Sequence, residues 1–307
     1  MPVKVDETLP AVEQLKKENI FVMGESRASS QDIRPLRIAV LNLMPLKIMA
    51  ETDLLRLLSN TPLQIEIDLV DTGAHDSHNT PEEHIAAFYK RFDEIKHNYY
   101  DGFIVTGAPV EKLRFEDVDY WERLTEIFDW TRTHATSTLY ICWAAFAGLY
   151  HFYGIDKVML DTKISGVFKH CSTSPLNHLM RGFDDTFYVP HSRYATLDPA
   201  DITPEKGLEV LAKSNEAGIY IIMGRNGREF YITGHSEYSP MTLDFEYRRD
   251  LAKGINPHIP CNYYPGDDPS RQPMVKWRSH ANLLFSNWLN YFVYQMTPFN
   301  LNDVANL

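Results

Sequence analysis

The stretch "STLYICWAAFAGLYHFYGI", residues 137–155, contains no Asp, Glu, Lys or Arg and is nearly long enough to cross a bilayer. Its first half, residues 139–141 above all, is rich in β-forming side chains and indicates a buried strand. Its second half, "WAAFAGLYHFYG", has the alanine content of a helix, with Gly154 as the C-terminal stop. We therefore expect a strand, a sharp turn at Cys142 and a helix, and not a membrane-spanning helix.

Two kinds of segment alternate upstream of this stretch. Short apolar runs predict strands at "RIAVLNLM" (37–44) and "GFIVTGAP" (102–109), and the alternating segment "QIEIDLV" (64–70) predicts another strand. Segments with helical spacing separate them, at 47–60, 80–100 and 116–134, and the last is followed by the strand before Cys142. Such alternation indicates a parallel sheet with helices on both faces, in which chemistry takes place beyond the carboxyl ends of the strands.

The downstream part has a more antiparallel pattern. Strands are expected around Lys163, in "GLEVLAKS" (207–214) and in 217–239, where Asn226-Gly227 between two apolar runs is a strong hairpin signal. Two helices follow, at about 241–253 and 273–296. The predicted fold class is α/β, with a mostly parallel, doubly wound sheet, an antiparallel extension and C-terminal helices.

The chain of 307 residues is long enough for one large α/β domain. We expect an N-terminal arm at 1–35 with a short helix near 10–18, a single α/β domain at 36–297 and a C-terminal tail at 298–307. The formal net charge of −11 argues against a nucleic-acid binder, which needs a basic face.

No secretory signal is recognisable at the N-terminus, and three cysteines in so long a chain suggest reduced thiols, so we expect a cytoplasmic protein. We expect no metal site, because no Cys/His cluster has ligand spacing and we interpret His75, His78 and His84 as part of a solvated loop and helix start.

Cys142 is a candidate nucleophile, because a thiol at a strand–turn–helix elbow lies beside a helix N-terminus that favours a thiolate. The Trp143 N–H would be one donor to an oxyanion. His235 and Glu237 follow a predicted strand with a spacing of two, so they can project together as a base and its orienting carboxylate. Taken singly, a plain buried cysteine and a structural histidine are the alternatives.

The motifs "NLMPLK" (42–47), "TGAPVE" (106–111), "CWAA" (142–145), "GHSEY" (234–238) and "RRD" (248–250) resemble those of the homoserine O-acyltransferases of methionine biosynthesis. The C-terminal stretches "NYYPGDDP" and "KWRSHANLLFSNWLNY" are also similar, and the resemblance covers essentially the whole chain. It implies a class I glutamine amidotransferase-like fold. It also implies that Cys142 carries an acyl-thioester, that His235 is the general base and that Glu237 orients it.

The same resemblance implies the substrate residues. Lys163, Ser192 and Arg249 fall where the family binds substrate, and a guanidinium at 249 suits the homoserine carboxylate. Lys47 falls where it would line the acyl-CoA pocket. Glu111 is the residue that distinguishes acyl donors: a glutamate goes with acetyl-CoA and a glycine with succinyl-CoA. A carboxylate there would repel the free carboxylate of a succinyl group and fill its space.

The predicted activity is therefore transfer of an acetyl group from acetyl-CoA to L-homoserine by a ping-pong mechanism, with acetyl-CoA as co-substrate and no other cofactor. The alternatives are a homoserine O-succinyltransferase, a glutaminase-type amidohydrolase on the same fold and a non-catalytic binding protein. One departure from the family is Phe146, where a glutamine is usual. We expect neither a nucleic acid nor a membrane as partner. The family implies a homodimer, although the apolar last helix is more commonly a core helix.

Overall fold

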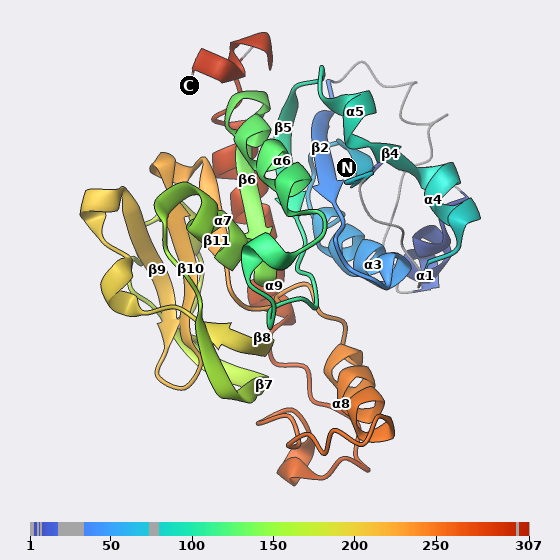
Figure 1. The fold of residues 1–307 in the computed structure, drawn as a ribbon, viewed down its shortest axis with the longest axis vertical. Helices are drawn as coiled ribbons and strands as arrows, with labels where there is room; N and C mark the ends of the chain where they lie inside the picture. The colour runs from blue at the N-terminus through green and yellow to red at the C-terminus, as the bar shows by residue number, and fades with distance from the viewer. Residues whose placement is uncertain are drawn as a thin grey trace.

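The computed structural model describes residues 3–4, 6, 8–17, 34–73, 80–298 and 301–306. These form a central mixed sheet with helices packed on its faces (Figure 1). The strands are β1 (Val3–Lys4), β2 (Leu36–Leu41), β3 (Ile65–Asp71), β4 (Tyr89–Arg91), β5 (Tyr100–Val105), β6 (Ala135–Ile141), β7 (Val158–Ser172), β8 (Thr186–Thr196), β9 (Leu208–Ser214), β10 (Gly218–Gly224) and β11 (Glu229–Ile232). The helices are α1 (Pro10–Lys17), α3 (Lys47–Leu58), α4 (Glu82–Phe88), α5 (Phe92–Ile95), α6 (Trp121–His134), α7 (Trp143–Tyr153), α8 (Thr242–Ala252) and α9 (Arg278–Asn287).

The strand order in the sheet is β1-β3-β2-β5-β6-β11-β10-β9-β7-β8, with β4 pairing β3. Every pairing from β1 to β11 in this order is parallel, and every pairing from β11 to β8 is antiparallel. The predicted parallel sheet with an antiparallel extension is therefore confirmed. The Asn226-Gly227 hairpin joins β10 to β11, and Asn226 has the positive φ of 54° that such turns require.

Each face of the sheet has its own apolar core, because alternate strand residues point to opposite sides. On β2, Ile38 and Val40 pack with α1, α3 and α9, whereas Ala39 and Leu41 pack with α5, α6 and α7. The expectation of helices on both faces is thus confirmed. The arm helix predicted near 10–18 is α1, which packs against α3, whereas residues 18–33 of the arm lie outside the described residues.

Three sequence-based expectations need correction. The single helix predicted over 80–100 is two short helices, α4 and α5, separated by β4, because residues 89–91 pair with β3. The sequence pattern also predicts Thr80 as the N-cap of this helix with Pro81 at its first position, but the residue before α4 is Pro81, without a side-chain cap bond. The helix predicted over 273–296 begins only at Arg278 and continues as a π-helical segment, Trp288–Tyr294.

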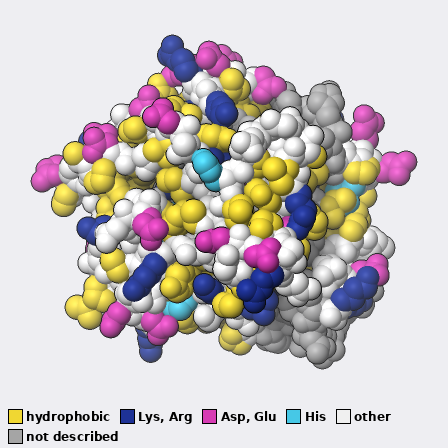
Figure 2. Space-filling view, turned by 90° about the horizontal axis from the view of Figure 1, so that it is seen from below, with side chains coloured by type: hydrophobic (Ala, Val, Ile, Leu, Met, Phe, Trp, Pro, Cys, Tyr) yellow, Lys and Arg dark blue, Asp and Glu magenta, His cyan; other side chains and the backbone are white. Residues whose placement is uncertain are grey.

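The apolar stretch 137–155 is a buried strand and a buried helix in the middle of the molecule. It comprises most of β6, the turn at Cys142 and α7, and Gly154 ends α7 in the left-handed conformation with φ 65°. None of the described helices is long and apolar enough to cross a membrane. The face of the molecule seen from below carries acidic and basic side chains interspersed with apolar ones (Figure 2).

Candidate active site

Cys142 lies at a tight turn between β6 and α7. Its φ is 51°, which is uncommon for a residue other than glycine, and its side chain is buried at the turn. The Cys142 N–H donates to the Ile232 carbonyl at 2.6 Å, so the turn is tied to the end of β11. A Cβ on Gly107 would lie 3.2 Å from the Cys142 Cβ, so only glycine leaves the space beside the thiol. The predicted elbow is therefore present.

His235 and Glu237 meet as predicted, although not for the reason expected from the sequence. β11 ends at Ile232, and both residues lie in the turn beyond it instead of at alternate strand positions. His235 Nδ1 lies 2.6 Å from Glu237 Oε1, and the His235 N–H donates to the Pro190 carbonyl at 2.8 Å. The turn that carries the pair is thus fixed to β8 as well as to β11.

The electrostatics of this pair favour a protonated imidazole. Burial opposes protonation of His235, but the negative charges of Cys142 and Glu237, with their hydrogen bonds, raise its pKa well above the usual value. The histidine is almost fully buried, so these charges act across little water. The arrangement can therefore hold a thiolate–imidazolium pair and shuttle a proton.

Gly107 and the start of α7 border the space around the thiol. Trp143 is the first residue of α7, and its backbone N lies 3.7 Å from the point where a Gly107 Cβ would be. The N–H groups at the start of a helix have no partner in the preceding turn and can donate to an anion. The indole of Trp143 is buried in the core and is not part of the site. The Trp143 N–H lies where it could donate to an oxyanion, and this role stays a prediction.

The predicted substrate residues lie around two carboxylates of α8. Lys163 Nζ is 3.3 Å from Glu246 Oε2 and 3.7 Å from Asp250 Oδ2, and the Ser192 hydroxyl also donates to Glu246. Arg249 pairs with Asp250, with 2.8 Å between Nη2 and Oδ1. Lys163, Ser192 and Arg249 come from β7, β8 and α8, and the fold brings all three to one place.

Tyr238 connects this group to the catalytic pair. Its ring stacks on the His235 imidazole with 4.1 Å between centroids, and its hydroxyl donates to Glu246 Oε1 at 2.8 Å. Sequence reasoning assigned no role to Tyr238 or Glu246. Tyr238 lies within the motif "GHSEY", and Glu246 lies one turn before Arg249 on the same helix, so both could have been found as neighbours of predicted residues.

Lys47 points into the protein interior. It is 3% exposed, its Nζ lies 3.3 Å from Asp71 Oδ2 and it donates to the Asn42 carbonyl. It is therefore not a solvated lysine, and its role in an acyl-CoA pocket stays a prediction. His84 is a correction of the same kind: it is buried, with Nε2 3.0 Å from Glu51 Oε1, instead of lying in a solvated loop.

His75 and His78 lie outside the described residues. The residues that the structure describes contain no group of three or more potential metal ligands.

Glu111 lies in the loop after β5, four residues beyond Gly107, the residue that borders Cys142. It is partly buried, and its negative charge acts on Lys157. Phe146 is fully buried on α7, one turn after Cys142, and its N–H donates to the Cys142 carbonyl at 3.4 Å. The expected packing of Phe146 on the elbow helix is therefore present.

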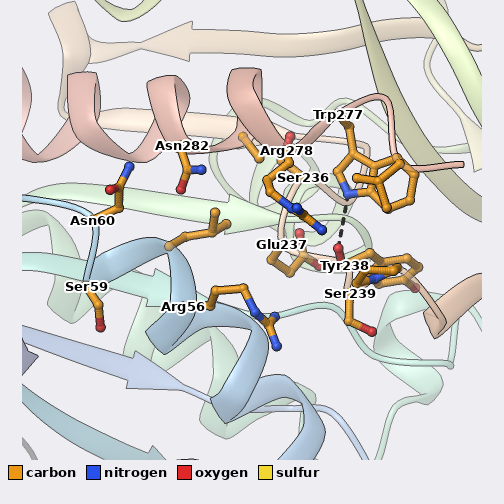
Figure 3. Close-up of a pocket in the computed structure, with 14 residues that line it drawn as sticks. Arg56, Ser59, Asn60, Ser236, Glu237, Tyr238, Ser239, Trp277, Arg278 and Asn282 are labelled. Carbon is orange, nitrogen blue, oxygen red and sulfur yellow. Dashed lines mark hydrogen bonds between the residues drawn. The ribbon is translucent and has the colours of Figure 1, made fainter. Parts of the chain in front are cut away.

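A cavity of about 690 Å³ lies behind Glu237 (Figure 3). Arg56 from the end of α3 and Arg278 from the start of α9 line its walls, and Trp277 Nε1 donates to the Tyr238 carbonyl at 3.0 Å beside it. Arg56 also pairs with the buried Asp53, with 2.8 Å between Nη1 and Oδ1. Glu237 thus shares the lining of this cavity with cationic groups.

The fold and this arrangement define a class. A doubly wound sheet with a cysteine elbow after one central strand and a His–Glu pair after the next is the class I glutamine amidotransferase-like fold. A solved glutamine amidotransferase from Thermotoga maritima superposes with a TM-score of 0.57 at 14% identity, over 85% of this chain and 100% of that one.

Within that class the chain belongs to the homoserine O-succinyltransferase family, whose sequence model matches residues 2–299. A relative from Bacteroides fragilis named homoserine O-acetyltransferase is 60% identical over 99% of this chain and 100% of its own length. A relative with the same name from Bacteroides thetaiotaomicron is 61% identical over the same shares, and one from Acetivibrio thermocellus is 56% identical. The family resemblance found in the sequence motifs is confirmed.

Proposed function

We propose that the protein is a homoserine O-acetyltransferase that transfers the acetyl group of acetyl-CoA to the hydroxyl of L-homoserine in methionine biosynthesis. The observation that carries this proposal is the assembly of Cys142, His235 and Glu237 at one site, in a chain about 60% identical over its length to relatives with that name. We place the reaction in the cytoplasm, with acetyl-CoA as co-substrate and no other cofactor. The homodimer implied by the family stays a prediction.

The first half-reaction acylates the cysteine. The Cys142 thiolate attacks the thioester carbon of acetyl-CoA, and backbone N–H groups, including that of Trp143, hold the tetrahedral oxyanion. The C–S bond to CoA then breaks, and the imidazolium of His235 gives its proton to the departing CoA sulfur. Exchange of one thioester for another needs little driving force, so this step is close to balanced.

The second half-reaction returns the enzyme to its starting state. Neutral His235 takes the proton from the homoserine hydroxyl as its oxygen attacks the acetyl carbon of the acyl-enzyme. The new C–O bond forms, the C–S bond to Cys142 breaks, and the thiolate leaves with the electron pair. Glu237 supports the imidazolium that forms in this step, since its carboxylate accepts from Nδ1.

L-homoserine is a zwitterion, and the group around α8 offers both charges it needs. We assign its carboxylate to Arg249 and Lys163 and its ammonium group to the Glu246 carboxylate. Glu246 and Asp250 form ion pairs with these cations. Binding of the amino acid would therefore exchange internal ion pairs for pairs with substrate, so that the charged groups keep partners of opposite charge.

Glu111 is assigned to the choice of acyl donor. The matching family is named for succinyl transfer and the near relatives for acetyl transfer, so donor choice is the part of the proposal most in need of a test. A carboxylate in the loop beside Gly107 would repel the free carboxylate of a succinyl group at short range.

The test measures release of CoA thiol from acetyl-CoA or succinyl-CoA in the presence of L-homoserine, for the wild type, Cys142→Ala and Glu111→Gly. We expect release with acetyl-CoA by the wild type, no release by Cys142→Ala, and a gain of at least tenfold in the succinyl/acetyl ratio for Glu111→Gly. Preference of the wild type for succinyl-CoA would leave the cysteine mechanism in place and refute the donor assignment. Silence with both donors, or glutamine hydrolysis instead, would overturn the proposed function.

A further inference from the structure

Arg193 on β8 is a fully buried arginine whose hydrogen bonds go to neutral acceptors. It is 1% exposed, and among the residues the structure describes it forms no salt bridge. Its guanidinium donates to the carbonyls of Ala195 and Ala217, and its Nε donates to His191 Nδ1 at 3.3 Å. Neutral acceptors therefore hold the group in place without balancing its charge.

The Arg193 group stays charged at neutral pH. Burial lowers its pKa to about 10, and the negative charge of Cys142 opposes that shift. Its neighbour His191 does not share the charge, because burial, with the Arg193 charge, lowers the His191 pKa well below its usual value. A lone buried cation is costly, so a fold that keeps one usually has an anion for it to act on.

The anion whose charge acts on Arg193 is Cys142, and Arg193 lies between two elements of the candidate site. On one side, the centre of the guanidinium lies 6.0 Å from the centroid of Phe146, one turn after Cys142 on α7. On the other side, His191 packs so closely on Gly234 that a Cβ there would lie 2.9 Å from His191 Cε1, and His235 is the next residue. The cation is thus fixed between the helix that carries the nucleophile and the turn that carries the base.

We propose that Arg193 is the permanent counter-charge of the Cys142 thiolate, a positioning residue that favours the ionised nucleophile in both half-reactions. His235 loses its positive charge when it protonates CoA, whereas Arg193 keeps its charge throughout. It therefore supports Cys142 as the attacking thiolate in the first step and as the leaving thiolate in the second. The inference needs Cys142 to be a reactive thiol, but it does not depend on which acyl donor is used.

Phe146 has a part in this arrangement. The amide of a glutamine would present a carbonyl oxygen to Arg193 and draw its positive charge toward the helix. The face of a phenylalanine ring attracts the cation only weakly and occupies the space without a competing hydrogen bond.

The test compares Arg193→Gln with Arg228→Gln. Arg228 is a matched control: it is also buried, burial also lowers its pKa to about 10, and its donors also go to backbone carbonyls, among them Thr136 at the other end of β6. The rate of iodoacetamide alkylation is followed against pH by peptide mass spectrometry, which separates Cys142 from the exposed Cys171 and Cys261. Circular dichroism establishes that each variant is folded.

For Arg193→Gln we expect the Cys142 titration to move up by about one pH unit, which is about tenfold less thiolate at a fixed pH below the midpoint. Arg228→Gln should leave the titration unchanged, and Arg193→Lys should recover most of the shift. Arg193→Met makes the same comparison if the glutamine variant does not fold. An unchanged titration in a folded neutral variant would overturn the inference. Because alkylation needs no acyl donor, a wild type inactive with both donors would refute the proposed function without affecting this result.

Discussion

Replacing Glu237 by glutamine tests the central hydrogen bond of the site. The 2.6 Å contact between His235 Nδ1 and Glu237 Oε1 joins two groups that are 5% and 12% exposed, so water screens it little. Glutamine keeps the shape and one acceptor oxygen but removes the charge. Attraction between two unit charges about 4 Å apart is roughly 4 kcal/mol at an effective dielectric constant of about 20, and partial screening by solvent brings the expected loss to about 2–4 kcal/mol.

A loss of that size corresponds to a reduction of roughly 30- to 1000-fold in kcat/KM, measured as release of CoA from acetyl-CoA with L-homoserine. The pH profile gives a second readout. Because Glu237 helps to raise the pKa of His235, Glu237→Gln should move the alkaline limb of the profile to lower pH. The exposed Glu216 provides a matched control, since Glu216→Gln changes the net charge by the same amount without removing any of these contacts. Activity within threefold of the wild type, with an unmoved alkaline limb, would refute the orienting role of Glu237.

Two further predictions concern stability. Burial raises the pKa of Asp53 to about 7, so the folded state holds this proton more tightly than the unfolded chain, whose aspartates titrate near 4. Between pH 5 and 8, the free energy of unfolding of the wild type should therefore fall by roughly 2–3 kcal/mol more than that of Asp53→Asn. If urea titrations give the two proteins the same pH dependence, this prediction is wrong. Gly154→Ala, at φ 65° with open space around it, should cost about 1–2 kcal/mol. Gly166→Ala should lower the melting temperature much more than Gly154→Ala, because its Cβ would clash with the Cys261 carbonyl oxygen. Equal decreases for the two variants would show that the backbone around Gly166 moves to relieve this clash.

The parts of the fold that the sequence predicted are those in which local pattern and tertiary structure agree. Strands β2 and β5 lie in short apolar runs, β3 has an alternating pattern, β6 is rich in β-forming residues, and the hairpin at Asn226 depends on turn chemistry alone. The helix predicted over 80–100 was wrong because three of its residues form β4 beside β3, a tertiary pairing that no local signal announces.

The candidate site was predictable to the extent that its residues belong to motifs. Cys142, His235 and Glu237 could be named because an elbow and a His-x-Glu spacing are visible in one chain, and the structure brings them together. Arg193 could not be assigned a role, since a charged residue in a strand gives no indication of whether it is buried, and Glu246 could be found only as a neighbour of Arg249 on the same helix. Their importance depends on which groups the fold places around them.

The nucleophile and the base follow two strands that lie side by side in the middle of the sheet, with Ile141 of β6 paired to Ile232 of β11. Their separation therefore depends on the spacing of hydrogen-bonded strands and on the short turn that carries His235, which is itself tied to β8. Local fraying at the periphery leaves the pair intact, whereas loss of the pair requires the central ladder to open. Inactivation of this protein by heat or denaturant should therefore report global unfolding. Enzymatic activity should be lost under the same conditions in which the slowest-exchanging amides of β6 and β11 lose their protection from hydrogen exchange.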